Sequence, residues 1–371
     1  MITFLYDQFN NICSNYLLNF IKNENIDYLT YDIKEAPADL INPVYVREIE
    51  NFDPAYDYFQ LLDARVKQKL LDGEIKYVFY STSETDEPME VKRRLSRLCN
   101  NHGIPKSHIE YLTPNYASEK YDEFTVFPHF ELKVYYEVRN NVPEQFENNR
   151  RQRIFTCNNM HNSIHTKIFC MTIWQHGFHK SGFFSYPMSN ITDEFDHPEN
   201  IPIMQWHEYW ENLPNLLSVF DLHTPINEQL IVNRDDRVFY QQSYWNFIVQ
   251  KNYFNDAIIL SEEMFRCVAN LQPFTVLGKQ NTLREFRKHG YQTLDGIINE
   301  SYDMLENDEQ RLNKCFLLGY HLMSQPDEWH INLISKAKNA LFHNQREFLK
   351  PKKGMLQHVI DTVVSSNQIQ K

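Results

Sequence analysis

Glycine is scarce in this sequence, since its 371 residues contain only nine. Neither the G-x-G-x-x-G fingerprint of dinucleotide-binding proteins nor the G-x-x-x-x-G-K-[ST] loop of P-loop enzymes occurs anywhere in it. Both motifs need glycine because the backbone must turn sharply and pass close to phosphate groups. The scarcity therefore excludes both glycine-rich phosphate loops, and a nucleotide site would need another construction.

The sequence also lacks paired cysteines and long apolar runs. Its six cysteines show no C-x-x-C spacing, and most lie in apolar stretches, which predicts reduced thiols in the core. No apolar run approaches about 18 residues, and the first residues have neither the basic region nor the apolar stretch of a signal peptide. We expect a protein without membrane attachment in the cytoplasm, which is the host cytoplasm if a phage encodes it.

Positive charge is in deficit, and the formal net charge is −12. This balance opposes non-specific binding to nucleic acids, which usually requires a basic field over the binding face. Three local clusters run against the average: Lys92, Arg93, Arg94 and Arg97; Lys279, Arg284, Arg287 and Lys288; and Lys350, Lys352 and Lys353. Each cluster is most simply a solvated helix face or tail, unless a partner requires it.

What the sequence does contain is typical of a folded protein, with 42% hydrophobic and 14% aromatic residues. Its length exceeds the usual size of one hydrophobic core. Short β-type runs alternate with helical stretches from residue 2, and the alternation resumes near residue 153 after a polar segment. The sequence predicts an α/β protein of two Rossmann-like domains that face a central cleft, with C-terminal helices. The expected boundaries are residues 1–145, residues 146–325 and a helical tail at 326–371.

Residues 259–278, ILSEEMFRCVANLQPFTVLG, predict a helix followed by a short strand. Ser261 is a good N-cap, and the Glu262 carboxylate in the first turn is favoured by the helix dipole. A carboxylate fixed at that point can accept hydrogen bonds from both hydroxyl groups of a ribose. The free N–H groups of the helix end suit a diphosphate. An ordinary capped helix would have the same residues, so the pattern alone leaves both interpretations open.

The same stretch resembles the donor-binding segment of fucosyltransferase-like enzymes and, more closely, of phage glycosyltransferase-like proteins. The resemblance continues without gaps through residues 281–303, NTLREFRKHGYQTLDGIINESYD. It implies a glycosyltransferase of the GT-B type whose C-terminal domain binds a nucleotide sugar, either a UDP-sugar or a GDP-sugar. By this resemblance Glu262 binds the ribose, Ser261 supplies the preceding hydroxyl, and Gly278 passes close to the nucleotide.

One position departs from the family pattern, because the expected lysine is Glu263 here. The resemblance then implies that Arg266 or Lys279 makes the missing phosphate contact. A divalent metal bound together with the diphosphate stays open, although no D-x-D pair follows a predicted strand.

Residues 154–167 carry a second resemblance, to a strand-to-helix turn of the same relatives. Asn159 and His165 match, whereas the arginines expected near them are absent. The cationic role would then belong to Lys167 or Arg153. A helix N-terminus with an amide, a hydroxyl and a cation remains a suitable diphosphate site.

Sugar transfer needs a group that accepts the proton of the acceptor or steadies the transition state. In parallel α/β sheets such groups lie at the carboxyl ends of strands. Asp7 follows the first predicted strand directly and is the preferred catalytic candidate, although a capping or turn role is equally open. His129, together with Arg93 and Arg94 on a predicted helix, is a candidate for acceptor binding.

Three functions remain open from the sequence. The relatives and the Asn-, Tyr- and Phe-rich composition suggest a phage source, and the acceptor would then be a hydroxymethylated cytosine in double-stranded DNA. A glycan acceptor is the second alternative. The third is a non-catalytic nucleotide- or glycan-binding relative, which the departures at the family's cationic positions favour.

Overall fold

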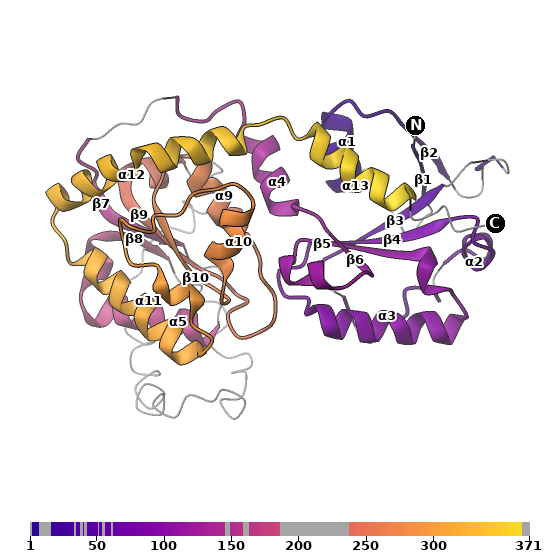
Figure 1. Cartoon of the computed structure of the whole chain (residues 1–371), viewed down its shortest axis with the longest axis horizontal. Coiled ribbons are helices and arrows are strands. Elements are labelled where there is room, and N and C mark those ends of the chain that lie inside the picture. The colour runs from indigo at the N-terminus through magenta and orange to yellow at the C-terminus, as the bar shows by residue number, and fades with distance from the viewer. Residues whose placement is uncertain are drawn as a thin grey trace. The chain divides into compact units, whose positions relative to one another are not determined.

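The computed structural model describes residues 2–6, 16–32, 35–37, 40, 43–50, 52–53, 56–60, 62–144, 149–158, 163–185 and 237–365. The chain forms two compact units. Unit 1 contains Met1–Arg139, Asn255–Glu262 and Leu349–Lys371, and unit 2 contains Asn140–Phe254 and Glu263–Phe348. Each unit is built on a parallel sheet, which confirms the predicted α/β class with two such sheets (Figure 1).

Unit 1 contains a six-stranded parallel sheet with the order β2-β1-β3-β4-β5-β6. Its strands are β1 (Ile2–Tyr6), β2 (Tyr28–Asp32), β3 (Val44–Ile49), β4 (Lys76–Ser81), β5 (Ile109–Thr113) and β6 (Phe124–Val126). The chain first turns from β1 to β2 on one side and then continues with β3 on the other side of β1. The crossovers therefore reverse direction between β1 and β3, and the carboxyl ends of these strands form the usual binding edge of such a sheet.

Helices cover both faces of this sheet, so its strands are apolar on both sides. The face with Val78 and Tyr80 packs under α1 (Tyr16–Asn23), α4 (His129–Val138) and α13 (Lys353–Ser365). The face with Tyr77 and Phe79 packs over α2 (Ala64–Leu71) and α3 (Pro88–His102). Alternate residues of β4 thus enter two separate cores, as the two-residue period of a strand requires.

The last helix of the described chain belongs to unit 1. The Lys352 side chain, which is 3% exposed, donates a hydrogen bond to the Glu131 carboxylate of α4 and lies over the ring of Tyr135. The residues that follow form α13, whose side chains, including Leu356 and Ile360, pack into the core of unit 1. The expectation that Lys352 belongs to a solvated tail is wrong, because the neighbouring helix supplies a buried carboxylate for it.

Unit 2 contains a four-stranded parallel sheet with the order β10-β9-β7-β8. Its strands are β7 (Arg153–Asn158), β8 (Gly182–Ser185), β9 (Ser243–Val249) and β10 (Phe274–Leu277). Here the crossovers reverse direction between β7 and β9. On the β7–β8 pair Gly182 lies opposite Phe155, and a Cβ atom at Gly182 would come within 2.3 Å of the Phe155 ring. Glycine lets the buried ring lie across the neighbouring strand.

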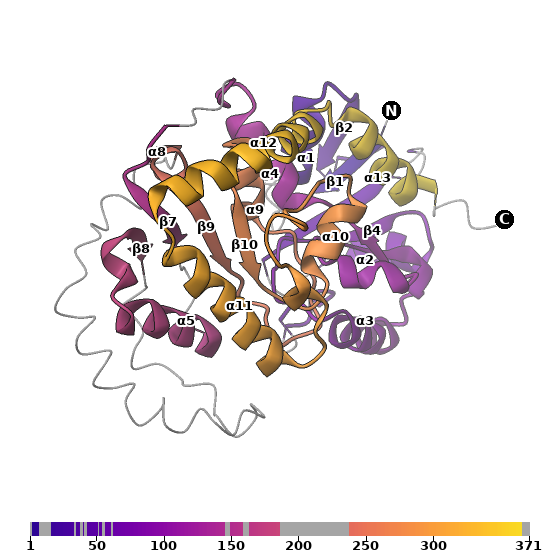
Figure 2. The same ribbon diagram turned by 60° about the vertical axis from the view of Figure 1, so that its left-hand side comes forward.

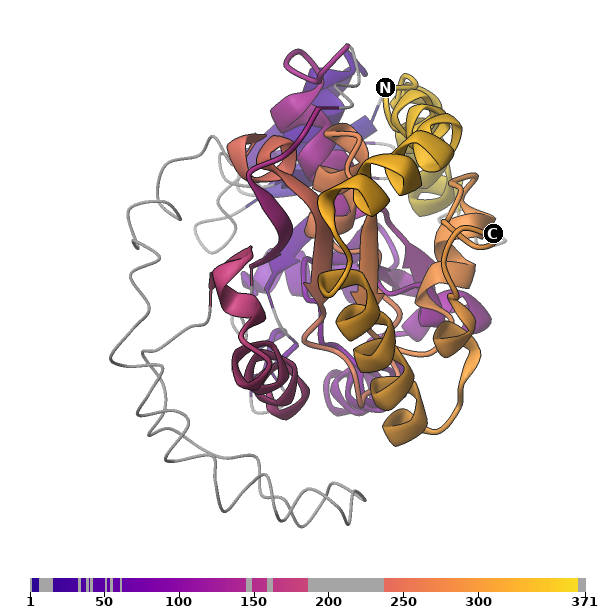
Figure 3. The same ribbon diagram turned by 90° about the vertical axis from the view of Figure 1, so that its left-hand side faces the viewer.

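The helices of unit 2 are α5 (Ile164–Gln175), α8 (Arg237–Gln242), α10 (Thr282–Lys288), α11 (Asp308–Met323) and α12 (Asp327–Phe348), together with most of α9 (Glu262–Ala269). Helices α5 and α11 lie side by side (Figure 2 and Figure 3). At Gly319 of α11 a Cβ atom would make ordinary van der Waals contact, at 3.5 Å, with both Phe169 of α5 and Phe247 of β9. Short 3-10 helices complete the described chain at Lys106–His108, Tyr116–Lys120, Phe178–Lys180 and Ser301–Met304.

The two units divide the chain differently from the predicted boundaries. Residues 326–371, predicted as one helical tail, contribute α12 to unit 2 and α13 to unit 1. The segment Asn255–Glu262, predicted within the second domain, belongs to unit 1. Among the described cysteines, the five at positions 99, 157, 170, 267 and 315 are buried free thiols, as their apolar surroundings predict.

Candidate functional site

The binding edge of unit 2 is spanned by a hydrogen bond of His165. This residue lies in the first turn of α5, which follows β7, and its Nε2 donates to the Gln250 carbonyl, 2.7 Å away, directly after β9. The imidazole is 1% exposed and stacks on Tyr253 with ring centres 4.8 Å apart. His165 therefore holds together the two strand ends between which the crossovers reverse direction.

Gly278 directly follows β10 at the same edge. A Cβ atom there would lie 2.3 Å from Oε1 of the buried Gln250 side chain, so any other residue at this position would require that side chain to shift. The Gly278 carbonyl accepts a hydrogen bond from Nε of Arg311 at 3.2 Å. In a trans peptide the following N–H points the opposite way, so the Lys279 N–H is directed away from Arg311.

Arg311 is a residue that the sequence analysis did not identify. Its guanidinium is 1% exposed, lies 4.5 Å from the centre of the Tyr253 ring, and donates to the carbonyls of Leu305 at 2.9 Å and Tyr253 at 3.3 Å. It also pairs with Asp308, three residues before it on α11. Arg311 thus fixes the loops after β9 and β10, and no local sequence signal marks this role because the Gly278 and Tyr253 carbonyls come from distant segments.

The remaining predicted donor residues of unit 2 occupy different positions. Lys279 follows Gly278 at the binding edge, whereas Arg266 lies in the last turn of α9, at the far end of that helix from Glu262. Lys167 lies in the first turn of α5, and its side chain is outside the described residues, as is all of Asn159. Arg153 begins β7 and so lies at the amino edge, away from the strand ends that bind ligands.

Ser261 and Glu262 belong to unit 1, where the loop before them is anchored to β5. The Asn115 side-chain oxygen accepts the Ile258 N–H at 3.0 Å, and the Tyr116 N–H donates to the Ile258 carbonyl at 2.9 Å. Ser261 is 4% exposed, and its hydroxyl has no hydrogen-bond partner among the described residues, so the predicted side-chain N-cap of α9 is not formed. The loop is thus held by the Asn115 side chain and the Tyr116 backbone, and it leads to Glu262 at the start of α9.

Glu262 forms an ion pair with Lys133 of α4. The Lys133 Nζ lies 2.6 Å from Oε2 of Glu262, and their side chains are 27% and 22% exposed. A partly buried carboxylate at the first residue of a helix is the group that the sequence predicted for ribose binding. The lysine beside it could not be foreseen, because it lies 129 residues earlier in the chain.

His129, one turn before Lys133 on α4, is a neutral hydrogen-bonding group. Burial, together with the nearby Lys133 ammonium, lowers the pKa of His129 to about 3, although the Glu262 carboxylate opposes the shift. Its Nδ1 is hydrogen-bonded to the Tyr80 hydroxyl. Burial, with a contribution from the Glu48 carboxylate, raises the pKa of Tyr80 well above its usual value. Tyr80 therefore stays protonated, and its hydroxyl donates a hydrogen bond to Nδ1 of His129. His129 then carries its own proton on Nε2 and acts as a donor rather than a base.

The predicted catalytic residue Asp7 lies outside the described residues, one position after the end of β1. The neighbouring strand β3 ends with Glu48 and Ile49. Burial raises the pKa of Glu48 to about 7, although the Tyr16 N–H opposes the shift and the Glu50 charge adds to it. Glu48 could not be identified from the sequence, because β3 itself was not predicted and burial cannot be inferred from the neighbouring residues alone.

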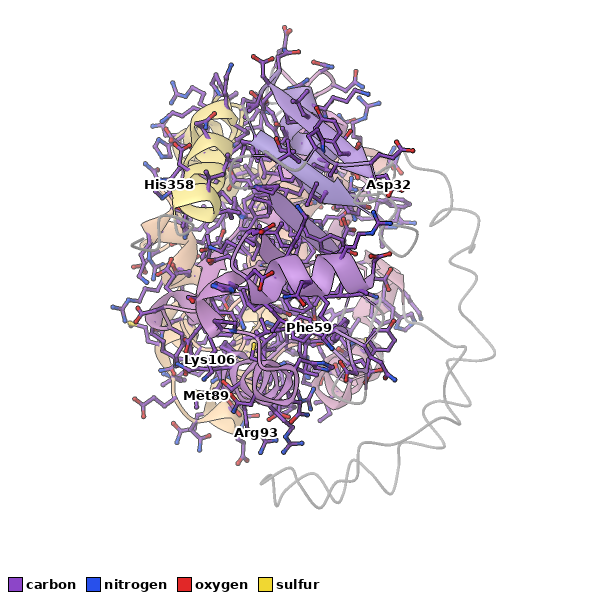
Figure 4. All side chains as sticks on the ribbon, turned by 90° about the vertical axis from the view of Figure 1, so that its right-hand side faces the viewer. Asp32, Phe59, Met89, Arg93, Lys106 and His358 are labelled. Carbon is purple, nitrogen blue, oxygen red and sulfur yellow. The ribbon has the colours of Figure 1, made fainter. Side chains whose placement is uncertain are left out.

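The basic residues on α3 are largely paired with carboxylates. Arg93 and Arg94 both contact Glu90, and Arg94 also donates to the Phe52 carbonyl at 3.2 Å. Arg93 is 71% exposed and projects outward from α3 (Figure 4), whereas Arg94 is largely covered. Lys92 pairs with Glu123 at 2.7 Å. Two carboxylates, Glu90 and Glu123, thus compensate part of the positive charge of this helix, which lowers its attraction for a polyanion.

Comparison with known proteins adds no family assignment. The sequence matches no protein family model, and no curated protein matches it. None of the helices in the described part of the chain combines the length and apolar character that a membrane span needs. The donor-site resemblance therefore rests on the residues themselves.

Proposed function

We propose that this protein is a glycosyltransferase that moves a sugar from a nucleoside-diphosphate donor to a hydroxyl acceptor. The observation that carries the proposal is the local structure of residues 259–278. Glu262 is the first residue of α9, Gly278 directly follows β10, and the two elements are joined as the resemblance to donor-binding segments requires. A helix-start carboxylate that can accept two hydroxyl protons suits the ribose of a UDP- or GDP-sugar.

The carboxyl edge of unit 2 supports the phosphate part of the proposal. His165 and the N-terminus of α5 lie beside Gln250, where the crossovers of the sheet reverse direction. Diphosphates bind at such helix starts because their unpaired N–H groups and dipoles face the anion. Lys167 and Lys279, which lie in the first turn of α5 and after β10, are the cations that we assign to the diphosphate.

Unit 1 is the proposed acceptor unit, with His129 as a hydrogen-bond donor to the acceptor. The carboxylates paired with α3 weaken the case for duplex DNA, since a DNA site must neutralise several phosphates. We therefore favour a glycan over hydroxymethylcytosine DNA as the acceptor. The GT-B arrangement of two domains that face a cleft, and a phage source, belong to the same proposal.

Release of nucleoside diphosphate tests the function. The wild-type protein is incubated with UDP- and GDP-sugars, each with a glycan panel, with hydroxymethylcytosine DNA or without acceptor. Glu262→Gln is compared with the matched control Glu263→Gln, which changes the next residue of the same helix turn. Acceptor-dependent release by wild type and by the control, but not by Glu262→Gln, supports the proposal.

Three other outcomes contradict parts of the proposal. Calorimetric binding of a nucleoside diphosphate without turnover on any acceptor identifies a non-catalytic binding protein. Absence of binding at millimolar nucleotide removes the donor site altogether. Transfer to DNA, but not to glycans, would reverse our order of acceptors.

A further inference from the structure

Glu48 lies at the binding edge of unit 1, near the end of β3. This strand borders β1, and the crossovers of the sheet reverse direction between the two. Because side chains alternate along a strand, Glu48 lies on the same face as Val44 and Val46, which pack toward α1 and α4. The carboxylate therefore occupies the strand end where ligands of such sheets bind.

The carboxylate of Glu48 has no cationic partner in the described part of the chain. Its one hydrogen bond there comes from the Tyr16 backbone N–H, which donates to Oε2 at 2.7 Å. Tyr16 is the first residue of α1, so one carboxylate oxygen caps this helix. A half-buried carboxylate without a lysine or arginine retains a high affinity for a proton.

The other groups that face Glu48 are uncharged or acidic. Tyr80 of β4 keeps its proton, and its hydroxyl is bound to His129 of α4, which is neutral. The Tyr16 ring packs edge-on against the His129 ring, with centres 5.1 Å apart. Glu50, two residues further along the chain, is exposed and contributes only negative charge. Apart from the Tyr16 N–H, whose hydrogen bond lowers the pKa of Glu48, these neighbours do not stabilise the ionised carboxylate.

We propose that Glu48 is the general base of the transfer reaction, an inference that rests on the proposed function. Its carboxylate accepts the proton of the acceptor hydroxyl while that oxygen forms a bond to the anomeric carbon of the donor. The bond between the anomeric carbon and the diphosphate breaks, and its electron pair leaves with the nucleoside diphosphate. The proton on Glu48 is then lost to solvent.

The pH dependence of activity follows from this role. The carboxylate must be ionised before it can accept a proton, and burial brings the pKa of Glu48 to about 7. Activity should therefore rise with pH through about 7 and level off above it. General base catalysis is most efficient when the pKa of the base lies near the working pH, because the base is then largely ionised and still binds a proton well.

Two variants distinguish a catalytic role of Glu48 from a purely structural role in capping α1. Glu48→Gln keeps an oxygen that accepts the Tyr16 N–H but cannot take up a proton, whereas Glu48→Ala removes both functions. If Glu48 is the base, both variants lose about 10²- to 10⁴-fold in kcat. The donor dissociation constant, measured by calorimetry, should be unchanged in Glu48→Gln.

Glu50→Gln is the matched control, since it removes a neighbouring carboxylate that is exposed. It should keep the kcat of wild type at high pH and move the ascending limb of the pH profile to lower pH, because the negative charge of Glu50 raises the pKa of Glu48. Retention of kcat and of the ascending limb in Glu48→Gln would overturn the assignment and leave Asp7 as the candidate. Absence of transfer by the wild-type protein itself contradicts the proposed function, and the base with it.

Discussion

The ion pair between Lys133 and Glu262 allows the ligand role of Glu262 to be separated from its structural role. Both side chains are about one-quarter exposed, at 27% and 22%, and Nζ and Oε2 lie 2.6 Å apart. Exposed pairs contribute about 0.2–1 kcal/mol to stability, and breaking a buried pair costs about 3–5 kcal/mol. This pair lies nearer the exposed limit, so we expect either Lys133→Met or Glu262→Gln to lower the free energy of unfolding by about 1 kcal/mol.

The two variants should differ in donor affinity. Charge-assisted hydrogen bonds contribute about 1.5–3 kcal/mol, so the loss of the Glu262 charge should weaken nucleoside-diphosphate binding by about tenfold to 150-fold. Lys133→Met leaves the carboxylate in place without its ammonium competitor. Its donor affinity should equal or exceed that of wild type.

Urea unfolding and calorimetric titration of the same preparations measure both quantities. The double variant Lys133→Met with Glu262→Gln should lose less stability than the sum of the single changes, because the two residues share one interaction. Equal loss of donor affinity in both single variants would refute the reasoning. Glu262 would then act only by holding α4 and the start of α9 together.

Three further predictions address other parts of the chain. Lys167→Met should weaken nucleoside-diphosphate binding by about 1.5–3 kcal/mol in calorimetry, whereas Arg153→Met, at the amino edge of the sheet, should leave it unchanged. Glu48→Gln should stabilise the fold relative to wild type above pH 7 and not below pH 4. The raised folded-state pKa of Glu48 confers stability that is lost as the pH rises from the ordinary glutamate pKa of 4.5 through about 7, and melting temperatures at pH 4 and pH 8 measure this loss. If DNA is the acceptor, Arg93→Glu should reduce the slope of log affinity against log salt by about 0.9 or more, and an unchanged slope removes α3 from any DNA site.

Several elements could be predicted because their signals are local. The strands β1 and β10 lie at the predicted residues, 2–6 and 274–277, since each is a short apolar run bounded by polar or turn residues. Helix α9 begins one residue after Ser261, where an N-cap and acidic first-turn residues predict a helix start. Such patterns involve only neighbouring residues, so the folded context is not needed to recognise them.

The strands β3 and β9 were not predicted, although each lies inside its sheet. The sequence of β3, VYVREI, ends with two charged residues, and that of β9, SYWNFIV, contains a polar asparagine. Both strands are covered on two faces, so neither shows the alternation of apolar and polar residues that marks a half-exposed strand. Because β3 was not predicted, Glu48 near its end could not be placed at the carboxyl edge of the sheet.

The sequence by itself determined the α/β class, the parallel arrangement of strands and helices, and the helix start that carries Glu262. Tertiary structure alone decided which charged groups are buried and what they contact. Arg311 lies against carbonyls up to 58 residues away, Lys133 against a carboxylate 129 residues away, and Lys352 against Glu131, 221 residues away. Secondary structure follows from backbone periodicity within a few residues, whereas burial and pairing, and with them pKa, depend on segments that meet only when the chain has folded.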